Sequence, residues 1–276
     1  MNYETIQVDS LTPRIGAEIS GVDLSQPLGN QTFKEVHDAL MEHQVIFFRN
    51  QRMSIDENKA FALLFGELHI HPMFGSDDIG HPELLVIRSD ETTKFAAGSG
   101  GWHSDVSCDP EPPMGSILYL TETPKTGGDT LFASMYAAYE DLSETMQQFL
   151  LGLTAVHSAE KAYDGRQEQR PQRRDETPPV AEHPVVRTHP VTGRRALFVN
   201  EIFTSHLKGM TSRESEAILG MLYEHIRQPK YHCRFNWREN SVAFWDNRCA
   251  QHYAMFDYYP EVRHGYRFTV QGDRPV

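Results

Sequence analysis

The residues with the clearest potential for chemistry are His103 and Asp105, in the string W-H-S-D at 102–105. In an extended segment, side chains two positions apart lie on the same face of the chain. The imidazole of His103 and the carboxylate of Asp105 can therefore reach one metal ion together. Two protein ligands are too few, and His252, in the string W-D-N-R-C-A-Q-H-Y, is the candidate for the third.

Two histidines and one carboxylate predict a particular kind of metal site. On one face of an octahedron they leave three positions open, which is the arrangement of non-haem Fe(II) oxygenases. A chelating co-substrate takes two of those positions and O₂ takes the third. An H-x-D pair is common by chance, so the prediction depends on the rest of the pattern.

Two arginines follow the third candidate ligand. Arg263 comes eleven residues after His252, and Arg267 comes four residues after Arg263. A guanidinium keeps its charge when buried, and its planar fork of donors matches a carboxylate or a sulfonate. Their even spacing on one strand would point both into one cavity. Without His252 nearby, arginines that are solvated or paired with surface acids would be the simpler interpretation.

These residues need a frame that is rich in β-strands. We predict strands at 45–48, 84–88, 115–121, 197–199, 231–237, 241–246 and 266–270, and two more within 4–24. We predict helices at 32–43, from Ser54 to Phe65, at 134–152 with a break near Leu142-Ser143, and from Thr211 to about Arg227. Because strands and helices do not alternate, the order favours a mainly β fold with added helices, built on a double-stranded β-helix, or jelly roll.

Composition restricts the class of protein. The chain has 276 residues and a formal net charge of -12, which suits one domain over 1–276 and makes nucleic acid an improbable partner. The three cysteines show no spacing typical of a disulfide framework or a zinc site. The first residues do not resemble a signal peptide and no stretch could span a bilayer, so we expect a cytoplasmic protein with no membrane partner. The polar, Pro-rich segment 160–184 is either a lid or a plain surface loop.

Several ordered strings resemble the taurine dioxygenase family, the sulfonate and herbicide dioxygenases of the Fe(II)- and 2-oxoglutarate-dependent class. They are I-G-A-E-I-S-G-V-D-L, F-G-E-L-H-I-H-P, W-H-S-D, G-G-D-T-L-F, H-P-V-V-R-T-H-P-V-T-G, L-F-V-N-E, W-D-N-R, Q-H-Y-A and the final R-x-x-x-R. The resemblance covers nearly the whole chain. It implies a single dioxygenase domain that hydroxylates a small anionic organic substrate with O₂, and a homo-oligomer.

The resemblance also implies roles for particular residues. His103, Asp105 and His252 match the Fe(II) ligands. Thr130 and Arg263 match the groups that bind the distal carboxylate of the co-substrate, 2-oxoglutarate. From the sequence alone, Thr130 would be an ordinary residue after a Gly-Gly turn.

The substrate side of the site is only partly like the taurine enzyme. His71 and Arg267 match the residues that hold the sulfonate, and Phe203 matches an aromatic residue that packs on the substrate. Other positions depart from the pattern: Phe74 replaces a Tyr, Ser99 replaces an Asn and Tyr163 replaces a Phe. Because an unmatched buried polar group is costly, we expect an anionic substrate, taurine or a related sulfonate, whose identity these changes leave open.

Three alternatives remain. The same chemistry could act on an alkyl sulfate, an aryloxyalkanoate or another carboxylate. A jelly-roll protein that binds an anion without turnover is a second alternative, although it would have no use for an open redox site. A zinc hydrolase on the same three ligands is the third, and it would leave Arg263 and Thr130 without a purpose.

Overall fold

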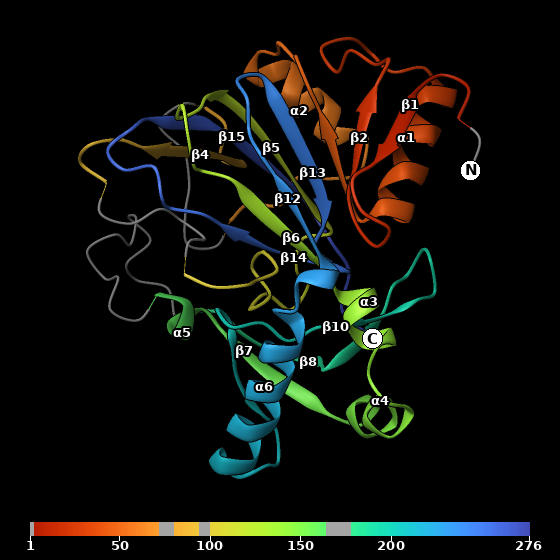
Figure 1. The fold of residues 1–276 in the computed structure, drawn as a ribbon, viewed down its shortest axis with the longest axis vertical. Helices are drawn as coiled ribbons and strands as arrows, with labels where there is room; N and C mark the ends of the chain where they lie inside the picture. Colours follow the sequence, from red (N-terminus) through yellow and green to blue (C-terminus); the bar gives the residue numbers. More distant parts are fainter. Residues whose placement is uncertain (1–2, 72–79, 94–99, 164–177) are drawn as a thin grey trace.

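The computed structural model describes residues 3–71, 80–93, 100–163 and 178–276, apart from the side chains of Lys161 and Tyr163. Most of the elements are strands, and they are arranged around one large sheet (Figure 1). The helices of the described ranges are short, and none of them is long and apolar enough to cross a membrane.

The large sheet has seven strands, and every pair of adjacent strands is antiparallel except β2 with β3, which are parallel. In spatial order they are β1 (Gln7–Ser10), β2 (Ala17–Ser20), β3 (Val45–Phe48), β13 (Ser241–Asp246), β5 (Gly115–Glu122), β15 (Arg263–Val270) and β4 (Leu84–Ser89).

A smaller antiparallel sheet faces the large one. Its strands are β12 (His232–Phe235), β6 (Thr130–Ser134) and β14 (Ala250–Ala254), with β6 in the centre. Aromatic side chains fill the space between the two sheets: Phe47 of β3 stacks on Phe235 of β12 at 4.0 Å between ring centres and meets Phe132 of β6 edge-on. Two facing sheets with an apolar interior form the predicted jelly-roll core.

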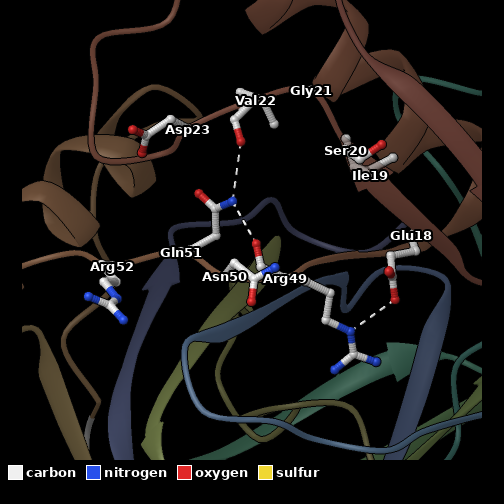
Figure 2. Close-up of a pocket in the computed structure, with 10 residues that line it drawn as sticks. All are labelled: Glu18, Ile19, Ser20, Gly21, Val22, Asp23, Arg49, Asn50, Gln51 and Arg52. Atoms are coloured by element: carbon white, nitrogen blue, oxygen red, sulfur yellow. Dashed lines mark hydrogen bonds and ion pairs between the residues drawn. The ribbon is translucent and has the colours of Figure 1, made fainter.

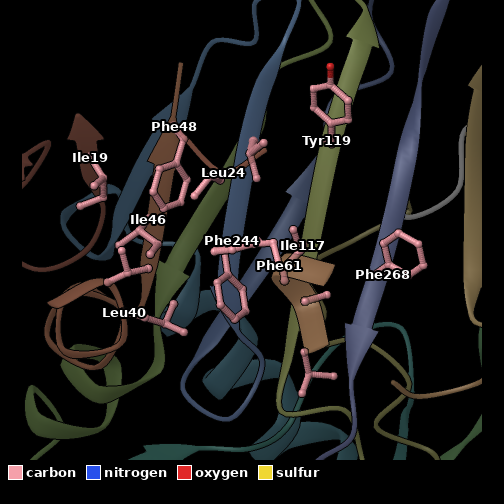
Figure 3. Packing of buried hydrophobic residues seen from close by; sticks show 14 of the residues in the cluster. Ile19, Leu24, Leu40, Ile46, Phe48, Phe61, Ile117, Tyr119, Phe244 and Phe268 are labelled. Carbon is pink, nitrogen blue, oxygen red and sulfur yellow. The ribbon is translucent and has the colours of Figure 1, made fainter. Parts of the chain in front are cut away.

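Two helices cover the outer face of the large sheet. They are α1 (Asn30–His43) and α2 (Ile55–Leu63). Strand β3 shows how the sequence divides the two layers: Ile46 and Phe48 pack under the helices, whereas Val45 and Phe47 point into the jelly roll, because successive side chains alternate across a strand. Figure 3 shows Ile46, Phe48, Phe244 and Phe268 in this outer layer, with Leu40 and Phe61 from the helices.

A second layer packs beside the small sheet around its own apolar cluster. One sheet of this layer has three strands, in the order β11 (Thr204–Leu207), β7 (Thr154–Ser158) and β8 (Val180–Pro184). The other has two strands, β10 (Arg195–Leu197) and β9 (Val186–Thr188). The helices of this layer are α3 (Met135–Glu140), α4 (Glu144–Leu151), α5 (Ala159–Tyr163), α6 (Ser212–Ile226) and the short 3₁₀ turn η3 (Pro229–Tyr231).

Most of the predicted elements are present. The capping boxes at Ser54–Glu57 and Thr211–Glu214 are both formed, and the predicted break at Leu142-Ser143 separates α3 from α4. The strand predicted at 231–237 is shorter than expected, and the strand predicted at 197–199 ends at Leu197. Strands β6, β7, β8, β9, β11 and β14 were not predicted, since each is short and lacks a clear alternation of apolar and polar residues.

Candidate metal centre

His103 and His252 lie opposite each other on two adjacent backbone segments. They form an isolated antiparallel bridge, with reciprocal hydrogen bonds from His103 N to His252 O (3.1 Å) and from His252 N to His103 O (2.9 Å). Their ring centres are 4.2 Å apart. Strand β14 therefore extends the small sheet to the W-H-S-D segment, which explains how two residues so distant in sequence meet.

Asp105 completes the predicted triad. One ligand atom from each of His103, Asp105 and His252 lies within 4.8 Å of the other two, and all three residues are buried. Asp105 follows His103 by two positions, so its carboxylate reaches the same side of the segment, as predicted. Its Oδ1 lies 3.9 Å from Nε2 of His252.

Hydrogen bonds indicate which nitrogen each histidine offers. Nδ1 of His103 lies 3.0 Å from the carbonyl oxygen of Gly101, which assigns the proton to Nδ1 and the lone pair to Nε2. For His252, Nε2 is the nitrogen that approaches Asp105, and its buried Nδ1 has no hydrogen-bond partner among the described residues. Nε2 is therefore the nitrogen that each histidine has available for a shared ion.

The electrostatic environment keeps Asp105 and His252 in the forms that bind metals. Burial raises the pKa of the Asp105 carboxyl, but the charges of Arg267 and the two histidines outweigh burial and hold this pKa well below its usual range. Burial, and then the charge of His103, lowers the pKa of His252 well below the ordinary value of histidine. At neutral pH the residues are thus a carboxylate and a neutral imidazole, which are the ligand forms.

Asn247 and Ser116 hold Asp105 in position. The Asn247 side chain accepts from the Asp105 backbone N–H at 3.2 Å and donates to Ser116 Oγ at 3.0 Å, and Ser116 donates to Asp105 Oδ2 at 2.7 Å. Trp245 donates its indole N–H to the same amide oxygen of Asn247 at 3.0 Å. These contacts fix Oδ2, so Oδ1 is the oxygen directed at the histidines.

Thr130 and Arg263 come from opposite sheets. Thr130 begins β6, two residues before Phe132, which pairs with His252 in the register of β14. Its side chain is therefore on the same face as that of His252, about 7 Å farther along the strand. Arg263 begins β15 in the large sheet and is 6% exposed.

Trp237, which no sequence motif singles out, joins these two residues. Its indole N–H donates to Thr130 Oγ1 at 2.9 Å, and the Arg263 Cζ lies 5.5 Å from the centre of its ring. Burial lowers the pKa of Arg263, and no carboxylate of the described ranges pairs with it. Its Nε has no hydrogen-bond partner there.

The residues fit a divalent iron and a dicarboxylic co-substrate. Two imidazoles and one carboxylate are the donor set of non-haem iron sites. A buried guanidinium without a partner costs free energy unless an anion reaches it, so Arg263 requires an anionic ligand. Thr130 places a hydroxyl near the same position.

Only some of the residues predicted to bind substrate lie in the described part of the structure, and two of these lie near the triad. Arg267 lies beside the triad, where its Nη1 donates to Asp105 Oδ1 at 2.8 Å, and the ring of the buried Phe203 lies 6.4 Å from that of His103. His71 is partly buried and comes two residues after His69, whose backbone pairs with Thr269 of β15. Outside the described part of the structure are Phe74, Ser99, the side chain of Tyr163 and residues 164–177 of the predicted lid or loop. The prediction of a loop over all of 160–184 was wrong at its ends, because residues 160–163 belong to α5 and 180–184 form β8, which pairs with β7.

A second group has the spacing of a metal site but is satisfied internally. It consists of His189, Asp246 and Cys249. Nδ1 of His189 accepts from the backbone N–H groups of Val191 and Thr192, and its Nε2 lies 3.0 Å from Asp246. Asp246 also accepts three hydrogen bonds from Arg248, one from its backbone N–H and two from its guanidinium. Because the donor atoms are already used, this is a structural charge network.

A surface pocket of about 640 Å³ lies between β2 and the segment after β3 (Figure 2). Two of its charged residues, Arg49 and Glu18, pair with each other at 3.0 Å, and Gln51 donates to backbone oxygens of Val22 and Arg49. None of the predicted site residues lines it.

A jelly roll that carries two histidines and a carboxylate on one side of a shared site is the architecture of the non-haem iron dioxygenases. The family model described as "Taurine catabolism dioxygenase TauD, TfdA family" matches residues 7–269. The chain therefore belongs to the TauD/TfdA family, and it is a 2-oxoglutarate-dependent dioxygenase. This family implies the use of iron, 2-oxoglutarate, O₂ and a small substrate.

Named relatives cover most of the chain. An alkylsulfatase of Acinetobacter baylyi is 39% identical over 98% of this chain and 86% of its own length. An alpha-ketoglutarate-dependent sulfonate dioxygenase of Saccharomyces cerevisiae is 35% identical over 100% of this chain and 69% of its own. The crystal structure of a taurine dioxygenase from Burkholderia xenovorans superposes with a TM-score of 0.84 at 38% identity, covering 99% of this chain and 93% of that one.

Proposed function

We propose that this protein oxidises a small organic anion that ends in a sulfur oxyanion, either a sulfonate or a sulfate ester, at the carbon next to that group. In this proposal His103, Asp105 and His252 hold Fe(II). The observation that carries the proposal is the convergence of these three buried side chains in a protein that also holds a buried cation, Arg263, without a partner among the described residues.

The co-substrate side of the site would be formed by Thr130 and Arg263. The guanidinium of Arg263 would bind the distal carboxylate of 2-oxoglutarate with two parallel hydrogen bonds, and the Thr130 hydroxyl would donate a third. Because Thr130 lies on the same face of the small sheet as His252, the keto acid would be held by both ends in one orientation.

The substrate side would be formed by Arg267 and His71. Arg267 already neutralises the Asp105 oxygen that faces the histidines, so an incoming oxyanion finds a cation next to the metal ligands. Phe203 would pack on the substrate's carbon chain. We further propose that Phe74, Ser99 and Tyr163 line the remaining pocket, and that their departures from the taurine pattern remove the contacts that a taurine amine would require.

When bound, the iron supplies the O₂ activation that no protein side chain can provide. The protein's part is to position the two organic partners and to exclude water. Two buried aromatic residues that lie against His252, Phe132 and Trp245, would exclude water from this side of the site. Oxidation converts 2-oxoglutarate and O₂ to succinate and CO₂, and it places a hydroxyl on the substrate carbon. That product breaks into an aldehyde and sulfite when the substrate is a sulfonate, or an aldehyde and sulfate when it is a sulfate ester.

The sharpest test is the release of succinate from Fe(II)-loaded protein across a panel of anions: taurine, butanesulfonate, hexyl sulfate and phenoxyacetate. We expect strong stimulation by one or both of the sulfur oxyanions without an amine, with sulfite or sulfate formed in step with succinate. Stimulation by phenoxyacetate alone would contradict the substrate class. Asp105→Ala serves as the control, and succinate production close to that of the wild type would refute the ligand assignment.

Two other functions predict different results in the same assay. A zinc hydrolase would release sulfate from hexyl sulfate with Zn²⁺ and without O₂. A binding protein would take up the anion without producing succinate. Neither gives a purpose to the paired Thr130 and Arg263.

We also propose that residues 1–276 act as one dioxygenase domain in a cytoplasmic homo-oligomer that does not bind nucleic acid. The net charge of -12 supports the last point, because an acidic chain repels phosphate backbones. The oligomer is supported by the family resemblance. Light scattering coupled to size-exclusion chromatography tests it, and a monomeric mass would overturn this part of the proposal.

A further inference from the structure

Trp237 occupies the position where the two sheets of the jelly roll come together at the co-substrate side of the site. It lies in the segment between β12 and β13, is 5% exposed, and packs edge-on against Phe235 with 4.9 Å between ring centres. It contacts Thr130 of the small sheet and Arg263 of the large sheet. These are the two residues proposed to bind the distal carboxylate of 2-oxoglutarate.

The contact with Thr130 determines which of the two groups donates in the hydrogen bond between them. An indole N–H can only donate, whereas a hydroxyl has one proton to donate and two lone pairs. In the hydrogen bond of 2.9 Å, Thr130 Oγ1 is therefore the acceptor. Within the described ranges, the Thr130 hydroxyl donates to no other group, so its own proton remains available for a ligand oxygen.

The contact between Trp237 and Arg263 does not use the N–H donors of the guanidinium. The guanidinium carbon lies 5.5 Å from the centre of the indole ring, within the range of a cation–π interaction. The ring restrains the buried cation through its face, whereas the N–H groups lie in the guanidinium plane. Trp237 thus restrains both residues and leaves their donors available for a carboxylate.

We infer that Trp237 is a positioning residue that makes the site selective for a 2-oxo acid with a second carboxylate. This inference rests on the proposed function. A tryptophan that served only as core packing would affect the stability of the protein and the binding of all 2-oxo acids alike. A positioning residue affects only acids whose distal carboxylate reaches Thr130 and Arg263.

The test measures binding to Mn(II)-loaded protein by calorimetry, without turnover. The two ligands are N-oxalylglycine, which has the distal carboxylate, and 2-oxopentanoate, which has a methyl group in its place. For Trp237→Phe we expect N-oxalylglycine to bind about tenfold more weakly, on the order of one hydrogen bond to a charged group, and 2-oxopentanoate to bind as it does to the wild type. An equal loss for both ligands, or no loss, would overturn the inference.

Two further variants of this protein distinguish a positioning role of Trp237 from a packing role. Replacement of Trp237 by benzothienylalanine, which keeps the ring size and removes only the N–H, should reproduce most of the loss for N-oxalylglycine, even if Trp237→Phe is poorly folded. Trp245→Phe is the matched control, because it also removes a buried indole N–H bond, but one directed at Asn247. It should weaken both ligands equally or neither.

A double-mutant cycle shows whether Trp237 acts through Thr130. In Thr130→Val the hydroxyl is absent, so adding Trp237→Phe should weaken N-oxalylglycine binding by much less than it does in the wild type. Full additivity of the two losses would contradict this route. If wild-type protein does not bind N-oxalylglycine at all, the proposed function itself fails, which is a different outcome from a wild type that binds and a variant that binds equally well.

Discussion

Arg267 donates from Nη1 to Oδ1 of Asp105 at 2.8 Å, so the cation predicted to bind the substrate is paired with a predicted metal ligand. The same oxygen faces His252. In the proposed complex, Arg267 would therefore contact both the substrate anion and a carboxylate that binds the metal. Because linkage is reciprocal, an anion that draws Arg267 away from Asp105 strengthens metal binding, and the metal strengthens anion binding in return.

Substitution of Arg267 should therefore have opposite effects on two ligands. We expect Arg267→Gln to tighten Mn(II) binding, because a cation no longer competes for Asp105 Oδ1, and to weaken the sulfur oxyanion by about tenfold or more. Calorimetry with Mn(II) measures the first effect, and the Michaelis constant for the stimulating anion measures the second. Arg263→Gln is the control, because it should weaken the apparent affinity for 2-oxoglutarate instead. Weaker Mn(II) binding in Arg267→Gln would disprove the competition.

Removal of the Ser116 hydroxyl should loosen Asp105. Ser116 donates to Asp105 Oδ2, and loss of such a partner of a metal ligand typically weakens metal binding by about tenfold to 100-fold. We expect Ser116→Ala to show this loss in a Mn(II) titration. Ser104→Ala is a matched control, because Ser104 is also buried but donates to the backbone oxygen of Asn247. Equal losses in the two variants would show that the carboxylate contact is not responsible.

The stability of the metal-free protein should fall as the pH falls below about 6.5, the ordinary pKa of histidine. Burial lowers the pKa of His252, and those of His183 and His232 as well, so the unfolded chain takes up protons that the folded protein does not. The free energy of unfolding then decreases with falling pH, by up to about 1.4 kcal/mol per pH unit for each such group. Urea unfolding between about pH 7.5 and pH 5.5 measures the slope, which should be smaller in His252→Gln. An unchanged slope in this variant would show that the buried His252 imidazole is not a cause of the pH dependence.

Gly265 lies between Arg263 and Arg267 at a register shift in the pairing of β15 with β5. A Cβ at this position would lie 2.1 Å from the carbonyl oxygen of Tyr119, so Gly265→Ala must displace the strand. We expect a loss of about 1–3 kcal/mol in stability, with weaker apparent affinity for both substrate and 2-oxoglutarate. Gly220→Ala, in α6 with no atom near the new Cβ, should be neutral or stabilising. Wild-type stability in Gly265→Ala would be inconsistent with the close approach of the two strands.

The proximity of His103 and Asp105 could be predicted because that signal is local, whereas His252 could be proposed only as a distant candidate that the fold brings beside them. His103 and Asp105 are two positions apart, and the helices that frame the sheet begin at capping boxes that are complete within four residues. Strand β14 was not predicted, since A-Q-H-Y-A has no apolar alternation, and it exists because β6 pairs with it.

Trp237 and Ser116 were missed for a related reason. Trp237 acts through Thr130 on the small sheet, and Ser116 acts through Asp105, which lies outside its strand; no motif in the sequence around Trp237 or Ser116 indicates the partner. An indole N–H or a hydroxyl predicted to be buried still requires a partner, and that requirement is the one signal that could have led to either residue.

Because a backbone bridge joins His103 to His252, a metal bound by both side chains would also stabilise the contact between the two segments that carry them. On its own, this bridge is a pair of amide contacts that can separate whenever the W-H-S-D segment drifts from the small sheet. An ion held by both imidazoles would connect the same two segments a second time, through metal–nitrogen bonds that do not depend on the backbone bridge. Loading with metal should therefore slow amide hydrogen exchange at these two positions more than elsewhere in the sheet.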